Sequence, residues 1–396
     1  MVDRWNYRLL SSVCEEITSG GAAPQGDKYF INGKYPFVRV VDMGNLHGQK
    51  YMLQTRDLLN DVGAEKLRLF PSGTILFTKS GASLLLNQRA ILKVPMYVVS
   101  HIGCLIPNEA IISEWLYYWM KTVDFNIYAH ATTLPSLKLT TIKELRIPVP
   151  TIPEQERIVA RIEELFSQLD AGVETLKKTK AQLAVYRQAV LKEAFSCCAE
   201  KKSIREMSSI VTSGSRGWAK YYCDNGAKFI RIGNLTRNKI YIDLDDIQHV
   251  QLPDKAEGTR TKLAPNDVLV SITADLGSIG LVPNGIGEAY VNQHIAMIRF
   301  NNQMQGEFYA WYLRSEYGQQ DLLRNKRGGG KLGLGLDDIR DSRVPVVSNE
   351  TAESILSIIE CRLSVCDSIE HTVDLALQQA EAMRQSILKD AFEGKL

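Results

Sequence analysis

The chain lacks the patterns that define a membrane segment, a secretory signal, a disulfide framework or a zinc site. No apolar run reaches the roughly 20 residues that a membrane helix needs, and the opening residues, Met-Val-Asp-Arg-Trp, contain no apolar signal stretch. The seven cysteines are an odd number without Cys-x-x-Cys spacing, so no disulfide framework or zinc site is indicated. We therefore expect a cytoplasmic protein with reduced cysteines and no contact with a membrane.

Familiar catalytic motifs are missing as well. There is no Asn-Pro-Pro-aromatic tetrapeptide of amino-methyltransferases and no Gly-x-Gly-x-x-Gly. The run from Gly328 to Lys331 looks like a phosphate loop, but it lacks the first glycine, and Leu332 replaces the hydroxyl that would hold magnesium. Residues 253–255 lack the second acidic residue of a nuclease motif. We predict a chain that is not an enzyme, with no catalytic residues and no cofactor or metal of its own.

Charge is almost balanced overall but uneven along the chain. The formal net charge is +2. Residues 1–150 carry +4 and residues 199–347 carry +3, whereas residues 151–198 carry 0 and residues 348–396 carry −5. This is a mild positive footprint of the kind that favours nucleic acid. An ordinary solvated surface explains it equally well.

An internal repeat without gaps is the most informative feature of the chain. The stretch 148–198 recurs as 345–395 at a constant offset of 197, so that Glu163 corresponds to Glu360 and Asp170 to Asp367. A repeat of this length, ending near the last residue, indicates that the molecule is built twice. Whatever the protein recognises is then expected to be recognised in two parts.

Both copies of the repeat have a seven-residue apolar period. The first copy places Ile162, Leu169, Leu176, Leu183 and Val190 seven residues apart, and the second places Ile359, Cys366, Val373, Ala380 and Ile387 likewise. Such heptads predict a coiled coil, and about 40 residues at about 1.5 Å each give a rod of about 60 Å. The simplest pairing is antiparallel, between the two helices, with the other blocks at opposite ends. The alternative is that each helix packs on its own globular block.

The remaining blocks resemble each other more loosely. Phe37-Val-Arg39-Val reappears as Phe229-Ile-Arg231-Ile, and the segment ending at His101 resembles the one ending at His294. Short β-branched runs broken by Gly, Asn and Pro predict strands and turns, and the aromatic stretches after Glu114 and Glu307 predict helices. We expect an α+β chain with an internal pseudo-two-fold repeat, in which two α/β domains, 1–150 and 199–347, are joined by helical regions 151–198 and 348–396.

Binding chemistry is left as the candidate function. Arg can pair bidentately with guanine, and Asn or Gln with adenine, in the major groove of DNA. Because two domains that recognise different sequences share scaffold residues, we expect the matched Arg39 and Arg231 to contact the DNA backbone or hold the fold. For any single candidate, a solvated or structural role remains the alternative, and the two histidines are expected to be structural. The candidate DNA-binding residues are Arg39, Lys79, Asn87, Arg89, Arg216, Lys220, Arg231, Asn234, Arg237, Asn292, Gln293, Lys326, Arg327 and Lys331.

Several motifs resemble one known family. The segment Ile147-Pro-Val-Pro150-Thr-Ile-Pro153-Glu-Gln155-Glu-Arg157 is similar to the proline-rich start of the helix in type I restriction-modification specificity subunits. The endings Leu191–Phe195 and Leu388–Leu396 resemble that family's helix ends, and Trp5–Gly20 with Pro36–Arg39 resembles the start of its target-recognition domains. The order of domain, helix, domain, helix also matches. The second helix departs from the pattern, because Glu350-Thr-Ala-Glu353 stands in place of the Pro-x-x-Glu-Gln motif.

The resemblance implies a subunit that recognises a bipartite, asymmetric sequence in double-stranded DNA, one half with each domain, while the coiled coil sets the spacer between the halves. It also implies two methyltransferase subunits and restriction subunits as partners, which would carry S-adenosylmethionine, ATP and Mg. The isolated chain could self-associate through exposed helical faces. The alternative is a coiled-coil scaffold that joins protein partners without recognising DNA sequence.

Overall fold

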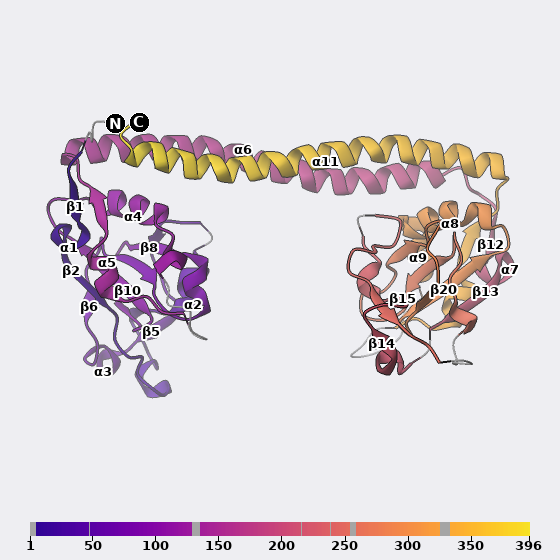
Figure 1. Cartoon of the computed structure of the whole chain (residues 1–396), viewed down its shortest axis with the longest axis horizontal. Helices are drawn as coiled ribbons and strands as arrows, with labels where there is room; N and C mark the ends of the chain where they lie inside the picture. The colour runs from indigo at the N-terminus through magenta and orange to yellow at the C-terminus, as the bar shows by residue number, and fades with distance from the viewer. Residues whose placement is uncertain are drawn as a thin grey trace. The chain divides into compact units, whose positions relative to one another are not determined.

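The computed structural model describes residues 5–46, 48–128, 135–214, 216–237, 239–253, 259–324 and 333–396. The chain forms two compact units, which we call unit 1 (residues 1–176 and 375–396) and unit 2 (residues 177–374). The long helices α6 (Ile152–Phe195) and α11 (Asn349–Phe392) each contribute residues to both units (Figure 1). Each unit therefore contains one α/β body and a stretch of both long helices.

The α/β body of unit 1 contains a five-stranded sheet in the order β2-β10-β7-β8-β4 and a four-stranded sheet in the order β5-β3-β9-β6, and a third pair, β1-β11, joins the beginning and the end of the body. Its strands are β1 (Tyr7–Leu9), β2 (Cys14–Ser19), β3 (Tyr35–Val38), β4 (Tyr51–Met52), β5 (Asp57–Leu59), β6 (Leu69–Phe70), β7 (Ile75–Thr78), β8 (Arg89–Leu92), β9 (Met96–Val98), β10 (Ile102–Pro107) and β11 (Arg146–Pro148). Its helices are α1 (Leu10–Val13), α2 (Val40–Gly44), α3 (Asp61–Ala64), α4 (Ser113–Thr122) and α5 (Leu139–Lys143), with 3-10 turns η1 (Asp27–Tyr29), η2 (Ala82–Leu86) and η3 (Phe125–Tyr128).

The α/β body of unit 2 repeats this plan. Its sheets have the orders β13-β20-β17-β18, β14-β16-β15-β19 and β12-β21. Its strands are β12 (Lys201–Ser203), β13 (Ser208–Ser213), β14 (Tyr222–Cys223), β15 (Ala227–Ile230), β16 (Gln248–Val250), β17 (Val268–Ser271), β18 (Ile279–Leu281), β19 (Ala289–Val291), β20 (Ile295–Phe300) and β21 (Arg343–Pro345). Its helices are α7 (Ile204–Met207), α8 (Gly306–Arg314), α9 (Glu316–Leu322) and α10 (Leu336–Asp341), with 3-10 turns η4 (Trp218–Tyr221), η5 (Ile232–Asn234), η6 (Thr259–Thr261) and η7 (Gln303–Gln305).

Corresponding sheets of the two bodies contain the same kinds of strand pairing. Antiparallel β7-β8 in unit 1 matches antiparallel β17-β18 in unit 2. Parallel β3-β9 matches parallel β15-β19. The expected α+β fold with an internal repeat is confirmed.

The long helices pair antiparallel within each unit. In unit 1, Arg384 of α11 contacts Asp170 of α6. In unit 2, Lys180 Nζ lies 2.7 Å from Asp374 Oδ1, and Arg187 Nη2 lies 2.6 Å from Asp367 Oδ1. As the residue number rises along α6 it falls along α11, which defines the antiparallel direction. The heptad positions of the sequence face inward, as Leu183, Val190, Cys366 and Val373 are all buried.

Each long helix also packs on an α/β body, through the aromatic residue at its end. Phe392 of α11 packs edge-on against the fully buried Trp115 of α4, with ring centroids 4.6 Å apart. The equivalent Phe195 of α6 packs against Phe308 of α8 at 5.4 Å. Figure 1 shows α4 and α8 between the sheets of their own unit and the long helices. The predicted aromatic helices are therefore core elements. Each long helix both pairs with the other long helix and packs on an α/β body.

A buried glutamine fixes the start of α6. Gln155 is fully buried; its Nε2 donates to the carbonyl oxygens of Ala110 and Pro150, and its Oε1 accepts from Ile112 N at 3.0 Å. In the second copy, where the motif departs, Ala352 occupies the equivalent position and is also buried. There Gln305, from η7, donates to the Val347 carbonyl at 3.1 Å and to Asn349. A glutamine from the body thus replaces the glutamine missing from the helix.

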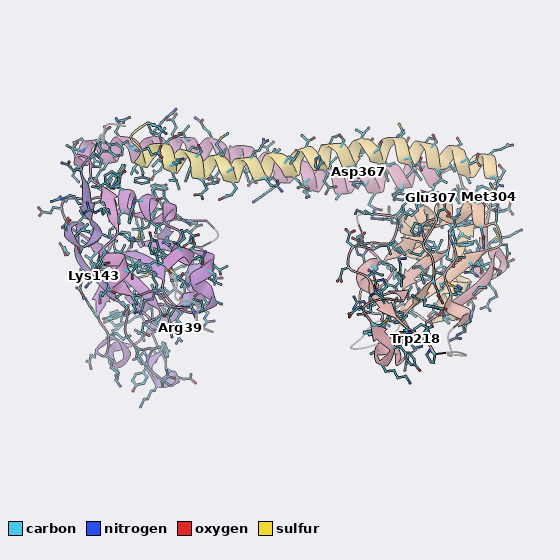
Figure 2. The ribbon with its side chains drawn as sticks, in the orientation of Figure 1. Arg39, Lys143, Trp218, Met304, Glu307 and Asp367 are labelled. Carbon is cyan, nitrogen blue, oxygen red and sulfur yellow. The ribbon has the colours of Figure 1, made fainter. Side chains whose placement is uncertain are left out.

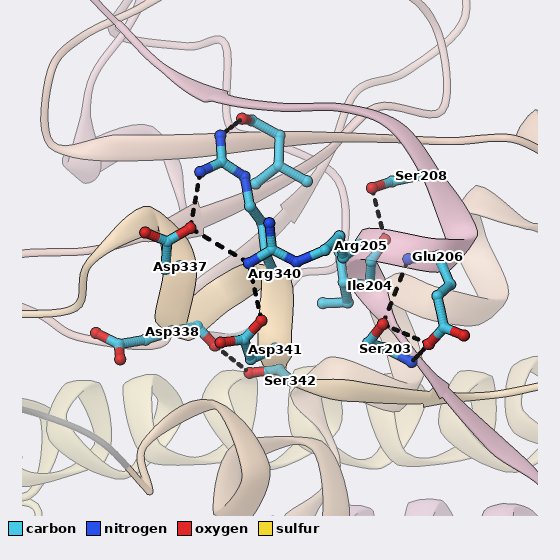
Figure 3. Close-up of polar contacts among 11 residues, drawn as sticks. Ser203, Ile204, Arg205, Glu206, Ser208, Asp337, Asp338, Arg340, Asp341 and Ser342 are labelled. Carbon is cyan, nitrogen blue, oxygen red and sulfur yellow. Dashed lines mark hydrogen bonds and ion pairs between the residues drawn. The ribbon is translucent and has the colours of Figure 1, made fainter.

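The beginning and end of the unit 2 body are tied together by charged side chains (Figure 3). Arg205 of α7 contacts Asp341 of α10 at 2.9 Å and Asp337 at 3.3 Å. Ser203 caps α7 together with Glu206. These contacts lie next to the strand pair β12-β21 and close the body upon itself.

Two further observations concern expectations from composition. In the part of the chain that the structure describes, no helix is long and apolar enough to cross a membrane. All seven cysteines are free.

Candidate nucleic-acid interface

Three loop segments meet beyond the ends of the central strands in each unit. In unit 1, Ser80 Oγ lies 2.8 Å from His101 Nδ1, and Ser80 forms a β-bridge with Ser136. In unit 2, Thr273 Oγ1 lies 2.8 Å from His294 Nδ1, and Thr273 forms a β-bridge with Gly333. We call this shared arrangement the strand-end site. The histidines hold the turns in place, as expected for structural residues.

The matched arginines lie at a second shared feature, a short capped turn after β3 and β15. The Arg39 N–H donates to Asp42 Oδ2 at 2.7 Å, and the Arg231 N–H donates to Asn234 Oδ1 at 2.8 Å. The Arg39 side chain pairs with Asp57 and lies 5.3 Å from the ring centres of Phe30 and Phe37. Arg39 lies away from the long helices of its unit (Figure 2). This arrangement supports a role for Arg39 in holding the fold.

Two predicted contact residues, Arg89 and Asn234, are buried, and the partly exposed Asn87 is hydrogen-bonded to Arg89. Arg89 is 3% exposed, stacks 3.9 Å from the ring centre of Phe125 and donates to Asn87 Oδ1 at 2.8 Å. Burial lowers the pKa of the Arg89 guanidinium to about 9. Asn234 is 5% exposed and donates to the carbonyl oxygens of Asp243 and Asp246. In this structure the side chains of Arg89, Asn87 and Asn234 stabilise loops, and their role as DNA contacts stays a prediction that this arrangement does not favour.

The surroundings of Arg231 and Asn292 are acidic. A hollow of about 500 Å³ in unit 2 is lined by both residues together with Asp243, Asp245 and Asp246. Asn292 is 9% exposed, and its Oδ1 accepts from the backbone of His294. Since carboxylates repel phosphate, this hollow is poorly suited to the DNA backbone. The role of Arg231 and Asn292 as DNA contacts stays a prediction that this acidic hollow does not favour.

Other predicted residues keep accessible side chains. Arg216 and Lys220 are exposed, while Lys79 is partly exposed and continues directly into the strand-end site of unit 1. Gln293 is partly exposed and contacts His294 Nε2 at 2.8 Å. Arg237 pairs with Asp275 at 2.5 Å, with 60% of its side chain exposed. Lys326, Arg327 and Lys331 lie outside the described residues.

Sequence reasoning missed an apolar group in unit 1. Leu85 and Leu86 of η2 are 54% and 67% exposed, and Ile127 of the neighbouring η3 is 76% exposed. It also missed the exposed Lys138, whose neighbour Leu137 donates its N–H to the Lys79 carbonyl at 2.9 Å. The signal in the sequence that could have revealed this group is a difference in the length of the equivalent turns. Ten residues separate β7 from β8, but seven separate β17 from β18.

The site offers hydrogen-bond donors, cations and apolar side chains rather than reactive groups. Among the described residues, no group of three or more His, Cys, Asp or Glu side chains could hold a metal ion. These donors, cations and apolar side chains are suited to binding a ligand.

Comparison with known proteins places this architecture in a family. The model of the type I restriction modification DNA specificity domain matches residues 2–184 and again 199–379. The chain belongs to this family and carries its domain twice. The family is described as the DNA specificity domain of type I restriction-modification systems.

Individual relatives are distant. The chain is 25% identical to the EcoBI specificity subunit of Escherichia coli over 301 residues, which cover 68% of this chain and 62% of the relative. It is 29% identical to the MjaIX specificity subunit of Methanocaldococcus jannaschii over 44% of this chain and 40% of the relative. It is 23% identical to the StySPI specificity subunit of Salmonella potsdam over 91% of this chain and 82% of the relative. The chain thus spans less than two thirds of the first two relatives.

Two solved structures share the fold across nearly the whole chain. One comes from work on complex assembly and conformational transition of the type I R-M system; it has a TM-score of 0.77 at 16% identity and covers 99% of this chain and 98% of its own. The other is the HsdS subunit from Thermoanaerobacter tengcongensis, with a TM-score of 0.55, also at 16% identity, covering 99% and 97%. At these identities the likeness shows the fold alone.

Proposed function

We propose that this chain recognises a bipartite, asymmetric sequence in double-stranded DNA, one half with each α/β domain. Residues 1–150 and 199–347 are the recognition domains, and residues 151–198 and 348–396 are the helical regions between and after them. The observation that carries the proposal is the paired strand-end site. Both units use the same anchor, Ser80 with His101 and Thr273 with His294, yet the turns next to these anchors differ in length and chemistry.

Constant anchors with variable turns suit a protein that recognises two different half-sites with one scaffold. The cations Lys79 and Lys138 near the turn of unit 1, and the exposed Lys220 of unit 2, supply phosphate contacts that position the domains. The base edges are then contacted by the turns themselves. The contact set we propose keeps Lys79, Arg216, Lys220, Arg237 and Gln293 and adds Leu85, Leu86, Ile127 and Lys138.

The long helices set the spacer between the half-sites and bind protein partners. Each helix has 44 residues, or about 66 Å at about 1.5 Å per residue, which exceeds one DNA turn of about 34 Å. In unit 2 the helices expose Val185, Ile358, Val365 and Ile369 at 41% or more. Exposed apolar stripes of this kind mark protein interfaces. We assign them to methyltransferase subunits, which together with restriction subunits would supply S-adenosylmethionine, ATP and Mg.

The test is a map of methylated adenines in DNA from cells that carry this chain and its neighbouring methyltransferase. We expect a bipartite motif that disappears when the gene for this chain is deleted. Exchange of residues 199–347 for another such domain should alter one half of the motif and leave the other unchanged. Methylation that does not depend on the chain would contradict the proposal and favour a scaffold without DNA recognition.

A further inference from the structure

We propose that the turn between β7 and β8 and the equivalent turn between β17 and β18 are the elements that contact bases and give the two domains different specificities. We define turn 1 as residues 79–88 and turn 2 as residues 272–278. Turn 1, together with Ile127, recognises a thymine methyl group in the major groove, and turn 2 presents Arg237 to a guanine. This inference rests on the proposed function.

The two turns start from the same place and diverge. β7 and β17 occupy equivalent central positions, each paired antiparallel with the strand after its turn. The second residue of each turn, Ser80 or Thr273, contacts a histidine, His101 or His294. From there turn 1 forms the 3-10 turn η2, whereas turn 2 bends at Ala274, which has a φ of 59°. Specificity between two copies of one scaffold must come from such points of divergence.

Turn 1 is a fixed platform. Thr78 Oγ1 donates to the Ser83 carbonyl at 3.0 Å, and Leu84 is fully buried beneath the turn. Asn87 ends η2 in the left-handed region, with a φ of 52°. The buried Arg89 then holds Asn87 by a hydrogen bond and stacks on Phe125 of η3. The guanidinium therefore fastens η2 and η3 together.

This platform holds three apolar side chains in solvent. Leu85, Leu86 and Ile127 are 54%, 67% and 76% exposed, although Leu84 and Phe125 beside them are buried. A rigid group of exposed apolar side chains marks a contact surface. Thymine is distinguished in the major groove by its C5-methyl group, which apolar side chains contact. The occupant that we assign to the surface is therefore the methyl edge of an A·T pair.

Charge next to the platform favours DNA over a protein partner. Lys79 begins turn 1, and Lys138 is brought beside it by the hydrogen bond from Leu137 N to the Lys79 carbonyl. Across the described parts of the chain, neither lysine forms an ion pair with a carboxylate. The acidic neighbour Asp124 is engaged by the Asn126 N–H at 2.9 Å. Unpaired cations flanking an apolar group match the phosphates that flank a base edge.

Turn 2 presents a different chemical group. Arg237 Nη2 donates to Asp275 Oδ1 at 2.5 Å and Nε donates to Oδ2 at 3.3 Å. Asp275 is fixed in turn by the Ser278 hydroxyl, which donates to Oδ2 at 2.5 Å. The carboxylate occupies the Nε–Nη2 edge of the guanidinium, and Nη2 also donates to the Leu276 carbonyl at 3.4 Å. Nη1 of this fixed guanidinium is left to donate to the N7 or O6 acceptor of guanine.

The test of turn 1 removes only the methyl group. The complex of this chain with its methyltransferase is assayed for binding to the mapped duplex, with each thymine in turn replaced by uracil. We expect one position in the half-site of domain 1 to lose about 5- to 10-fold in affinity. The double variant Leu85→Asn, Leu86→Asn should lose that sensitivity and accept other bases there. Ile31→Asn is the control, because Ile31 is another exposed apolar residue of unit 1, at 61% exposure. This variant should keep the sensitivity to the thymine methyl group.

The test of turn 2 removes one acceptor of guanine. Replacement of a guanine by 7-deazaguanine in the half-site of domain 2 should weaken binding by about 10-fold or more at one position. Arg237→Gln should abolish that difference, whereas Arg205→Gln, at another exposed ion-paired arginine of unit 2, should not.

The outcomes separate the two proposals. If a chain-dependent bipartite motif exists but no thymine or guanine shows these dependences, or if they persist in the turn variants, the inference is overturned and the proposed function stands. If the variants instead lose methyltransferase binding without changing base preference, the apolar platform is a protein interface and the inference is again overturned. If methylation never depends on the chain, the proposed function itself fails.

Discussion

Arg187 of α6 donates through Nη2 to Asp367 of α11 at 2.6 Å and to Glu370 at 2.9 Å. The equivalent pair in the sequence repeat, Arg384 with Asp170, forms in unit 1. The same ion pair thus occurs once in each unit, and each joins α6 to α11. Register along a coiled coil is set by such specific polar contacts as well as by the apolar seam.

Loss of Arg187 should therefore loosen the helix pair of unit 2. Its side chain is 21% exposed and has two carboxylate partners, so we expect Arg187→Ala to lower the free energy of unfolding by about 1 kcal/mol, and less at high salt. Thermal unfolding at low and high salt measures the change. Arg161→Ala is the matched control, because Arg161 pairs with Glu164 within one helix and should cost only about 0.3 kcal/mol. Equal effects of the two variants would contradict the role of Arg187 between helices.

The aromatic ends of the long helices should matter more than the ion pairs. Phe392 is 7% exposed and packs on Trp115, so Phe392→Ala leaves a cavity between α11 and α4. This variant should destabilise unit 1 by about 3 to 5 kcal/mol. Phe195→Ala should do the same to unit 2 through Phe308 and Tyr312. Hydrogen exchange that rises in α4 for the first variant and in α8 for the second would support this. Exchange that rises in both bodies for either variant would contradict it.

The sequence predicted well what depends on periodicity. The heptads running from Ile162 and from Ile359 predicted two helices, and the predicted regions 151–198 and 348–396 enclose α6 and α11 closely. The apolar period persists over many helical turns, so a single residue that breaks it does not change the prediction of a helix. The antiparallel pairing was the simplest arrangement for two such helices that are separated by a globular block in one chain.

Individual contact residues were less predictable, because burial depends on residues far along the chain. Arg89 looked like an exposed donor in a polar turn, but Phe125, 36 residues later, covers its guanidinium. The sequence analysis assigned no role to Leu85 and Leu86, which the 3-10 turn exposes while Leu84 takes the buried position. One sequence shows residue types but not which side of a short turn faces the core.

Protonation should affect the contact between the body of unit 2 and α11. Glu307 lies at the face of α8 toward the long helices (Figure 2) and accepts from Tyr241 Oη at 3.1 Å. Burial raises the pKa of the Glu307 carboxyl above its usual 4.5, and the charge of Glu360 on α11 raises it further, although the hydrogen bond from Tyr241 opposes this.

A raised pKa in the folded state means that this group stabilises unit 2 below about pH 4.5 and that the stabilisation is lost as pH rises through the folded pKa. Glu307→Gln keeps an acceptor for Tyr241 without the charge. We expect this variant to melt above the wild type at pH 7 and to lose its advantage as pH falls toward 4.5. A difference in melting temperature that does not vary with pH would contradict the assignment.

Variants of Arg89 and Lys79 should have opposite effects, one on the stability of unit 1 and the other on DNA binding. Arg89→Met removes the hydrogen bonds to Asn87 and the Gln88 carbonyl inside unit 1, and should lower the free energy of unfolding by about 2 to 4 kcal/mol. Below the melting temperature it should leave the dependence of DNA affinity on salt unchanged. Lys79→Gln should have little effect on stability but reduce the slope of log affinity against log salt by about one. A reduced salt slope for Arg89→Met would return Arg89 to the phosphate contacts.

Longer helices should lengthen the DNA spacer. Asp170 with Arg384, Lys180 with Asp374 and Arg187 with Asp367 share one antiparallel register, so a heptad added to both helices preserves it. Insertion of seven residues after Lys178 and seven after Leu375 adds about 10.5 Å, close to three base pairs at about 3.4 Å each. We expect methylation of the same two half-sites with a spacer longer by about three base pairs. It should be weaker than in the wild type, because three base pairs also rotate one half-site by about 100° relative to the other. A seven-residue insertion in α6 alone breaks the register and should abolish methylation, and an unchanged spacer with both insertions would show that the helices do not set it.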